Sequence, residues 1–261
     1  MIQALTPDLY IAAIGRSGST MLCNMLTRAP EQIIFIEPKF HTPPYRSLLA
    51  PQLATFGMEI SDARQKQARG LAPIAMLDHL LGPHLRPIKW GFKEVQCSEH
   101  HKVLTQFAPA HILINTRHIF NVALSFMEKH RRQGNQARFS PAWVRDYCER
   151  ESQGLVQFCQ HLSHIGQPHT LVRYEDLTED ANFRPALEKS LNWTFGTEAD
   201  RFLQGFNRGF EASRHQGRAF KAPTLAERGL PDELVKLAAD IETRCAEYQT
   251  FFGYSPLKDQ P

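Results

Sequence analysis

The segment that most restricts the fold of this chain is Asp8 to Arg28, with the sequence DLYIAAIGRSGSTMLCNMLTR. Residues 9–14 are apolar without alternation, which predicts a strand covered on both faces. Gly15 and Gly18 allow backbone angles and close approaches that other residues resist. The helix expected next leaves its first amide N–H groups unpaired, and with its dipole these form an anion site. The loop is therefore predicted to hold a phosphate-like group, with further charge and donors from Arg16, Ser17, Ser19 and Thr20.

The loop departs from the GxxxxGK[ST] pattern of nucleoside triphosphatases. With Gly18 aligned to the second glycine, Ala13 replaces the first glycine and Ser19 replaces the lysine. Both departures count against an ATPase or a kinase, and the cation stands inside the loop, at Arg16. An ordinary strand-to-helix turn, in which the hydroxyl groups only cap the helix, is the simpler alternative.

Short apolar segments recur along the rest of the chain and alternate with helical ones. After the first strand they lie at 32–36, 88–95, 110–116 and 169–173. Helices are expected at 61–81 (interrupted at Gly70 and Pro73), 98–107 with Ser98 as cap, 121–132, 140–165 with Ser140 as cap, 183–191, 197–206 and 231–249. This alternation predicts one domain over residues 1–261, an α/β/α sandwich around a five-stranded parallel sheet.

Polar or aromatic residues stand where each predicted strand ends. In a parallel sheet, ligands bind outside the carboxyl ends of the strands. Five side chains far apart in the sequence are therefore expected to meet at one edge: Arg16, Glu37, Lys93, Arg117 and Tyr174.

Composition restricts the class of protein and its partners. The net charge of +3 is too small to indicate nucleic-acid binding, although it suits a local pocket for a polyanion. The five cysteines are scattered and odd in number, which favours a reducing compartment and argues against a cysteine metal site. We see no secretory signal and no apolar run near the roughly 20 residues that span a bilayer. A cytoplasmic location without a bound metal is therefore expected.

Three motifs, taken in order, resemble those of the sulfotransferases that use 3′-phosphoadenosine 5′-phosphosulfate (PAPS). The loop GRSGST resembles their 5′-phosphosulfate loop. In ILINTRHIFNVALSFM, Arg117 and the serine eight residues later, Ser125, match the family's ligands of the 3′-phosphate, although Ile119 replaces the usual proline. LVRYEDL is similar to a segment that puts Tyr174 near the adenine. The resemblance implies the P-loop-like sulfotransferase fold.

The resemblance also implies catalytic roles. A glutamate soon after the loop is the base in the tyrosylprotein and bacterial trehalose (carbohydrate) branches, and here it is Glu37. Lys93 resembles the lysine that assists the leaving group in those branches, and Arg16 would contact the 5′-phosphosulfate. His118 is the rival base, because small-molecule sulfotransferases use a histidine. Arg218, in the basic segment 213–221, would help to close over the 3′-phosphate.

The predicted function is sulfuryl transfer from PAPS to a hydroxyl acceptor, a carbohydrate or other small molecule, with release of 3′-phosphoadenosine 5′-phosphate (PAP). Segments 38–85 and 131–165 match no familiar motif and are assigned to the acceptor side. Two alternatives remain open, a divergent P-loop kinase and a PAP-binding protein without turnover. The sequence does not specify the oligomeric state.

Overall fold

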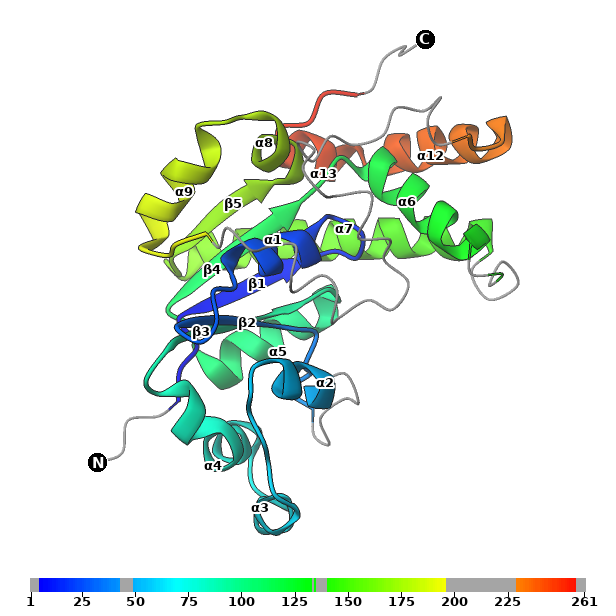
Figure 1. Ribbon diagram of the computed structural model, residues 1–261. Helices are drawn as coiled ribbons and strands as arrows, with labels where there is room; N and C mark the ends of the chain where they lie inside the picture. Colours follow the sequence, from blue (N-terminus) through cyan, green and yellow to red (C-terminus); the bar gives the residue numbers. More distant parts are fainter. Residues whose placement is uncertain (1–4, 43–48, 133, 135–139, 196–228, 257–261) are drawn as a thin grey trace.

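The computed structural model describes residues 5–42, 49–132, 134, 140–195 and 229–256. Its centre is the predicted parallel sheet of five strands, and the strand order is β2-β3-β1-β4-β5 (Figure 1). The strands are β1 (Leu9–Ala13), β2 (Gln32–Ile36), β3 (Lys89–Glu94), β4 (His111–Thr116) and β5 (His169–Arg173). β1 lies between β3 and β4, so the loop after it opens at the middle of the carboxyl edge.

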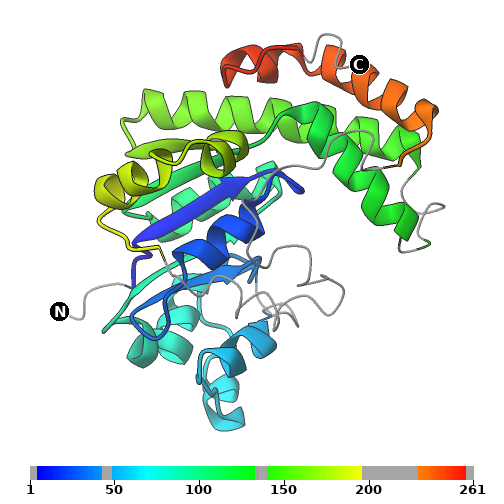
Figure 2. The same ribbon diagram turned by 45° about the horizontal axis from the view of Figure 1, so that its top comes forward.

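Helices cover both faces of the sheet, which gives the expected three layers (Figures 1 and 2). Successive strand residues point to opposite faces. In β1, Leu9 and Ile11 pack in one core, whereas Tyr10 and Ala12 pack in the other. The core with Leu9 includes α1 (Ser19–Leu26), α8 (Tyr174–Glu179) and α9 (Phe183–Leu191). The core with Tyr10 includes α4 (Pro73–Leu85), α5 (Cys97–Phe107), α6 (Ile119–Arg132), α7 (Pro141–His164), α12 (Asp232–Arg244) and α13 (Ala246–Phe251).

Several helix boundaries differ from the sequence expectation. The segment 61–81 contains α3 (Asp62–Gln67) and the start of α4, and α2 (Leu49–Thr55) precedes them. The expected last helix is divided at Cys245 into α12 and α13. A short helix, α8 at Tyr174–Glu179, was not predicted. The helix predicted at 197–206 lies outside the described residues.

The two predicted helix caps have different outcomes. Ser140 caps α7 as expected, because its side chain accepts a hydrogen bond from the Trp143 amide at 3.2 Å. The cap at Ser98 is wrong, since α5 already begins at Cys97. A distant carboxylate replaces the local cap: Glu151 of α7 accepts the Cys97 amide proton at 2.7 Å. None of the helices in the described ranges is long and apolar enough to cross a membrane.

Candidate active site

The loop after β1 makes a tight turn into α1. Gly18 is the N-cap residue with φ 84°, a left-handed angle that suits glycine. A Cβ there would come within 2.2 Å of the Tyr174 ring, so the ring packs directly on the glycine. Arg16 also has a positive φ of 70°. The loop is therefore shaped by a close contact with the end of β5 as well as by its own glycines.

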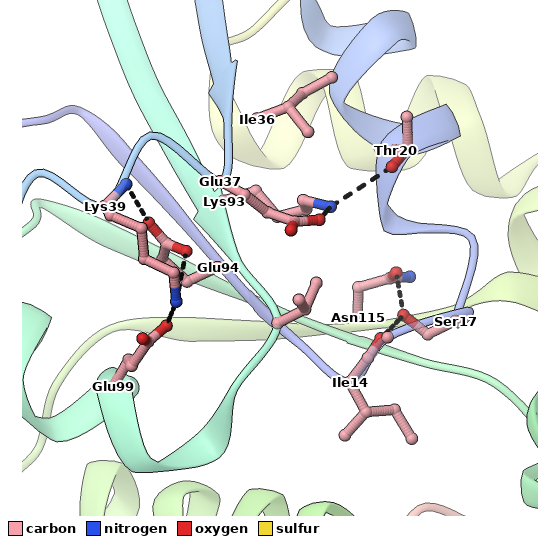
Figure 3. A network of polar contacts seen from close by, with 12 residues as sticks. Ile14, Ser17, Thr20, Ile36, Glu37, Lys39, Lys93, Glu94, Glu99 and Asn115 are labelled. Atoms are coloured by element: carbon pink, nitrogen blue, oxygen red, sulfur yellow. Dashed lines mark hydrogen bonds and ion pairs between the residues drawn. The ribbon is translucent and has the colours of Figure 1, made fainter. Parts of the chain in front are cut away.

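Ser17 faces the interior of the loop. Its Oγ lies 2.8 Å from the Ile14 carbonyl oxygen and 3.0 Å from Asn115 Oδ1. The Ser17 amide also donates to the Ile14 carbonyl, at 3.4 Å. The side chain is fully buried and appears with Asn115 in Figure 3. These contacts give the Ser17 hydroxyl group a part in holding the loop against β4.

The residues assigned to the nucleotide form one connected group. Arg16 Nε donates to Ser125 Oγ of α6 at 3.1 Å. Arg117 Nη1 donates to the Arg16 carbonyl at 3.3 Å, and its guanidinium lies over the Tyr174 ring, 4.3 Å from the centroid. The ends of β1, β4 and β5, together with α6, thus bring together two arginines, a hydroxyl group and an aromatic face. Such a set suits a phosphorylated nucleoside.

The residues assigned to catalysis also meet. Lys93 Nζ, at the end of β3, donates to Glu37 Oε1 at 2.8 Å and to Thr20 Oγ1 of α1 at 3.3 Å (Figure 3). The Lys93 side chain is only 1% exposed, whereas the Glu37 side chain is 27% exposed. The carboxylate therefore faces solvent from a fixed position beside the loop, with the ammonium group held beneath it.

The rival base, His118, is directed elsewhere. Its ring is buried, with Nε2 3.0 Å from the Ser255 carbonyl and 2.8 Å from Gln249 Nε2. Glu242 of α12 lies 3.4 Å from the same nitrogen. These contacts connect the end of β4 to the C-terminal helices. Because the ring nitrogen of His118 is occupied there and the Glu37 carboxylate faces solvent, Glu37 is the better candidate for the base.

The acidic residues that follow β5 make structural contacts with neighbouring elements. Asp176 forms a paired salt bridge with Arg173 at 2.7 and 2.8 Å. Glu175 accepts hydrogen bonds from the His118 amide and from the Tyr254 hydroxyl group, each at 3.1 Å. Arg218 and the segment 213–221 lie outside the described residues.

Tyr147 is a part of the site that the sequence did not indicate. Its position on the apolar face of α7 predicts a core residue, and it is buried. Its hydroxyl group nevertheless accepts the Gly15 amide proton at 2.9 Å and lies 3.4 Å from the Val95 carbonyl. Tyr147 therefore joins the loop after β1 to the end of β3. A tyrosine in an otherwise apolar stripe was the only available signal.

Positive charge dominates the edge of the sheet. Besides the two arginines and Lys93, α6 contributes Lys129, one helical turn after Ser125. Desolvation lowers the pKa of Lys129, and the nearby charges of Arg16 and Lys93 lower it further, while Glu37 raises it. Such a cluster can bind a polyanion and stabilise negative charge on a leaving group. Within the described residues no group of three or more His, Cys, Asp or Glu could hold a metal ion.

A buried carboxylate, Glu94, lies next to Lys93 in the sequence. Burial raises the pKa of Glu94 to about 7, although the Lys39 ammonium group and amide lower it. The folded state therefore binds the proton of Glu94 more tightly than the unfolded chain does. Stability from this group is present at low pH and is lost as pH rises through about 7.

Glu94→Gln is accordingly expected to flatten the pH dependence of stability. Between pH 5 and pH 8 the wild-type free energy of unfolding should fall relative to the variant by up to about 3 kcal/mol. Urea unfolding at pH 5, 6, 7 and 8 measures this difference. The exposed Glu247 provides the control, since Glu247→Gln should keep the wild-type slope. Parallel curves for wild type and Glu94→Gln would contradict the expectation.

No protein-family model matches this sequence, and no curated protein matches it. Solved structures do resemble it over almost its whole length. Sulfotransferase STF9 from Mycobacterium avium has a TM-score of 0.57 at 14% identity, covering 97% of this chain and 78% of that one. The sulfotransferase domain from the curacin biosynthetic pathway has a TM-score of 0.53 at 18% identity, covering 97% and 99%. The sulfotransferase domain from the Synechococcus PCC 7002 olefin synthase has a TM-score of 0.51 at 15% identity, covering 97% and 96%. The chain therefore has the fold of sulfotransferase domains, with a P-loop-like strand, loop and helix at its centre.

Proposed function

We propose that the protein is a PAPS-dependent sulfotransferase that transfers a sulfuryl group to a hydroxyl acceptor and releases PAP. The observation that carries the proposal is the Glu37–Lys93 pair, 2.8 Å apart beside the loop. A solvent-facing carboxylate and a buried cation at one anion site are the two groups that this chemistry needs. General-base and electrostatic catalysis would then come from neighbouring strand ends.

The residues present fit the donor that this proposal requires. The start of α1 and Arg16 would hold the 5′-phosphosulfate, through Gly18, Ser19 and Thr20. Arg117 and Ser125 would hold the 3′-phosphate, with Tyr174 against the adenine and Arg218 as an additional cation. The contacts of Arg117 with both the loop and the Tyr174 ring support this placement.

The roles of the side chains follow from their positions. PAPS, when bound, supplies the activated sulfuryl group. Glu37 removes the proton of the acceptor hydroxyl group, and the proton stays on its carboxylate. Lys93 and Arg16 stabilise the charge that develops on the leaving phosphate. No step is assigned to a metal ion.

The acceptor and the setting of the reaction are further parts of the proposal. We assign a small molecule or carbohydrate as acceptor, in line with the bacterial carbohydrate and tyrosylprotein branches that the motifs resemble. Segments 38–85 and 131–165 would lie on the acceptor side of a single domain. The proposed location is the cytoplasm.

Thermal stabilisation by PAP is expected to identify the donor site. A ligand at about 100 times its dissociation constant adds roughly 2.7 kcal/mol to the stability. For a chain near this size, the unfolding temperature should rise by roughly 5–10 °C without added magnesium. Differential scanning fluorimetry with PAP, and with Mg·ATP for comparison, measures the effect. A shift with Mg·ATP but none with PAP would reject the proposal and favour the P-loop kinase.

A further inference from the structure

The segment that carries Glu37 has an unfavourable backbone. Glu37 and Lys39 have φ angles of 51° and 58°, and Pro38 stands between them. Side chains with a Cβ rarely adopt this left-handed region, because the Cβ crowds the following carbonyl group. Such conformations persist where surrounding contacts hold them. The contacts that hold this turn therefore determine where the Glu37 carboxylate lies.

Two consecutive residues of β3 fix the ends of the turn. The Lys93 carbonyl accepts the Glu37 amide proton at 2.8 Å. The Glu94 carboxylate accepts the Lys39 amide proton, also at 2.8 Å from Oε1. The turn is thus held at one end by a strand backbone and at the other by a single side chain.

The side chain of Lys39 returns to the same carboxylate. Lys39 Nζ lies 3.4 Å from Glu94 Oε2 and 3.1 Å from Gln96 Oε1, and it also pairs with Glu99 of α5. Glu94 is fully buried and Lys39 is 4% exposed. Figure 3 shows this group beside the Glu37–Lys93 pair. Glu94 therefore binds Lys39 through both its backbone and its ammonium group.

Glu94 does not face the proposed reaction. Its neighbours at alternate positions, Trp90 and Phe92, belong to the core on the α5 side of the sheet. Lys93 points to the other side, where it meets Thr20 of α1. Because alternate strand residues face opposite ways, Glu94 reaches the site only through the turn.

We propose that Glu94, through its contacts with Lys39, is a positioning residue that fixes the turn carrying the Glu37 carboxylate. The inference rests on the proposed function, in which Glu37 is the base. A base must lie within hydrogen-bond reach of the hydroxyl proton, and a displacement near 1 Å is enough to lower a rate strongly. The Glu94–Lys39 contacts prevent that displacement from the opposite face of the sheet.

The test compares four variants with the wild type: Glu94→Ala, Glu94→Gln, Glu37→Gln and the double variant Glu94→Ala/Glu37→Gln. PAPS is the donor, and the acceptor is whichever of 4-nitrophenol, glucose and N-acetylglucosamine the wild type uses fastest. Glu94→Ala should lower kcat about 10- to 100-fold, with little change in the KM for PAPS. Glu94→Gln keeps an oxygen that accepts the Lys39 amide proton and should retain most of kcat at pH 8.

Glu151→Ala is the matched control. Glu151 is also a buried carboxylate that accepts a backbone amide proton, that of Cys97, but it holds the start of α5. Its removal should lower the unfolding temperature and leave kcat within about twofold of the wild type at a temperature where both are folded. A general effect of losing a buried acceptor is thereby separated from an effect on Glu37.

The double variant decides between positioning and an independent effect. If Glu94 acts only through Glu37, Glu94→Ala should not lower the residual rate of Glu37→Gln. An equal loss in both backgrounds, or a wild-type kcat in Glu94→Ala, overturns the positioning role while the sulfotransferase function stands. Wild-type kcat in Glu37→Gln overturns the base assignment and the positioning role together. If the wild type transfers sulfate to none of the three acceptors and PAP does not bind, the proposed function itself fails.

Discussion

Glu37→Gln is expected to lower kcat for sulfuryl transfer by about 10²- to 10⁴-fold, the usual contribution of general-base catalysis. In the wild type, Lys93 Nζ donates a hydrogen bond to Glu37 Oε1 at 2.8 Å. The amide oxygen of the glutamine can still accept this hydrogen bond. The amide cannot remove a proton from an acceptor. The affinity for PAP should stay within about twofold, because a base that contacts the acceptor contributes little to binding of the other product.

Two measurements in parallel test this expectation. Initial rates of PAP formation give kcat, and calorimetric titration with PAP gives the dissociation constant. Glu31 offers a matched control, because it is exposed and directly precedes β2, whereas Glu37 directly follows it. Glu31→Gln should have the kcat and the PAP affinity of the wild type. Undiminished turnover in Glu37→Gln would remove Glu37 from the mechanism. A parallel loss of PAP binding would instead show that the variant disturbs the loop.

Of the variants considered, Arg117→Ala should lose the most affinity for PAP, roughly 10- to 100-fold. A loss of this size is expected when charged hydrogen bonds worth about 1.5–3 kcal/mol are removed. The guanidinium of Arg117 is buried, lies over Tyr174 and donates to the Arg16 carbonyl. It is therefore fixed before any ligand arrives, and binding should require little further ordering of the side chain.

Adenosine 5′-monophosphate makes this prediction specific, because it lacks the 3′-phosphate. Arg117→Ala should weaken PAP strongly and adenosine 5′-monophosphate only slightly. Arg69, an exposed arginine between α3 and α4, is the control for a general loss of positive charge. Equal weakening of both nucleotides would mean that Arg117 supports the loop or the adenine site and does not bind the 3′-phosphate.

The sheet and the strand-to-helix loop could be predicted because they depend on short-range patterns. Continuous apolar runs mark strands that are buried on both faces, and GRSGST marks a strand-to-helix turn. The pairing of Glu37 with Lys93 and the contact of Arg16 with Arg117 also follow from the sequence, because the carboxyl ends of parallel strands lie along one edge. Catalytic roles at that edge stay predictions until variants are measured.

Contacts between distant elements were not predictable in the same way. Ser98 looks like a helix cap, yet Glu151 caps that helix from α7. His118 stands beside Arg117 in the sequence, but its partners come from the C-terminal helices. In Glu94 the sequence shows a charged residue that is ordinarily exposed, and only packing reveals its burial. Each case depends on tertiary neighbours that no local pattern encodes.

The hydrogen bonds of the loop itself limit which of its main-chain donors an anion could use. Gly15 gives its amide proton to Tyr147, and Ser17 gives its amide proton to the Ile14 carbonyl. Two donors at the beginning of the loop are thus occupied by the protein, and the opening turn of α1 is left to supply the main-chain donors. The free amides at the start of a helix are sufficient to hold one phosphate-like group. This arrangement suits the donor of the proposed function, in which a single 5′-phosphate is bonded directly to the sulfuryl group.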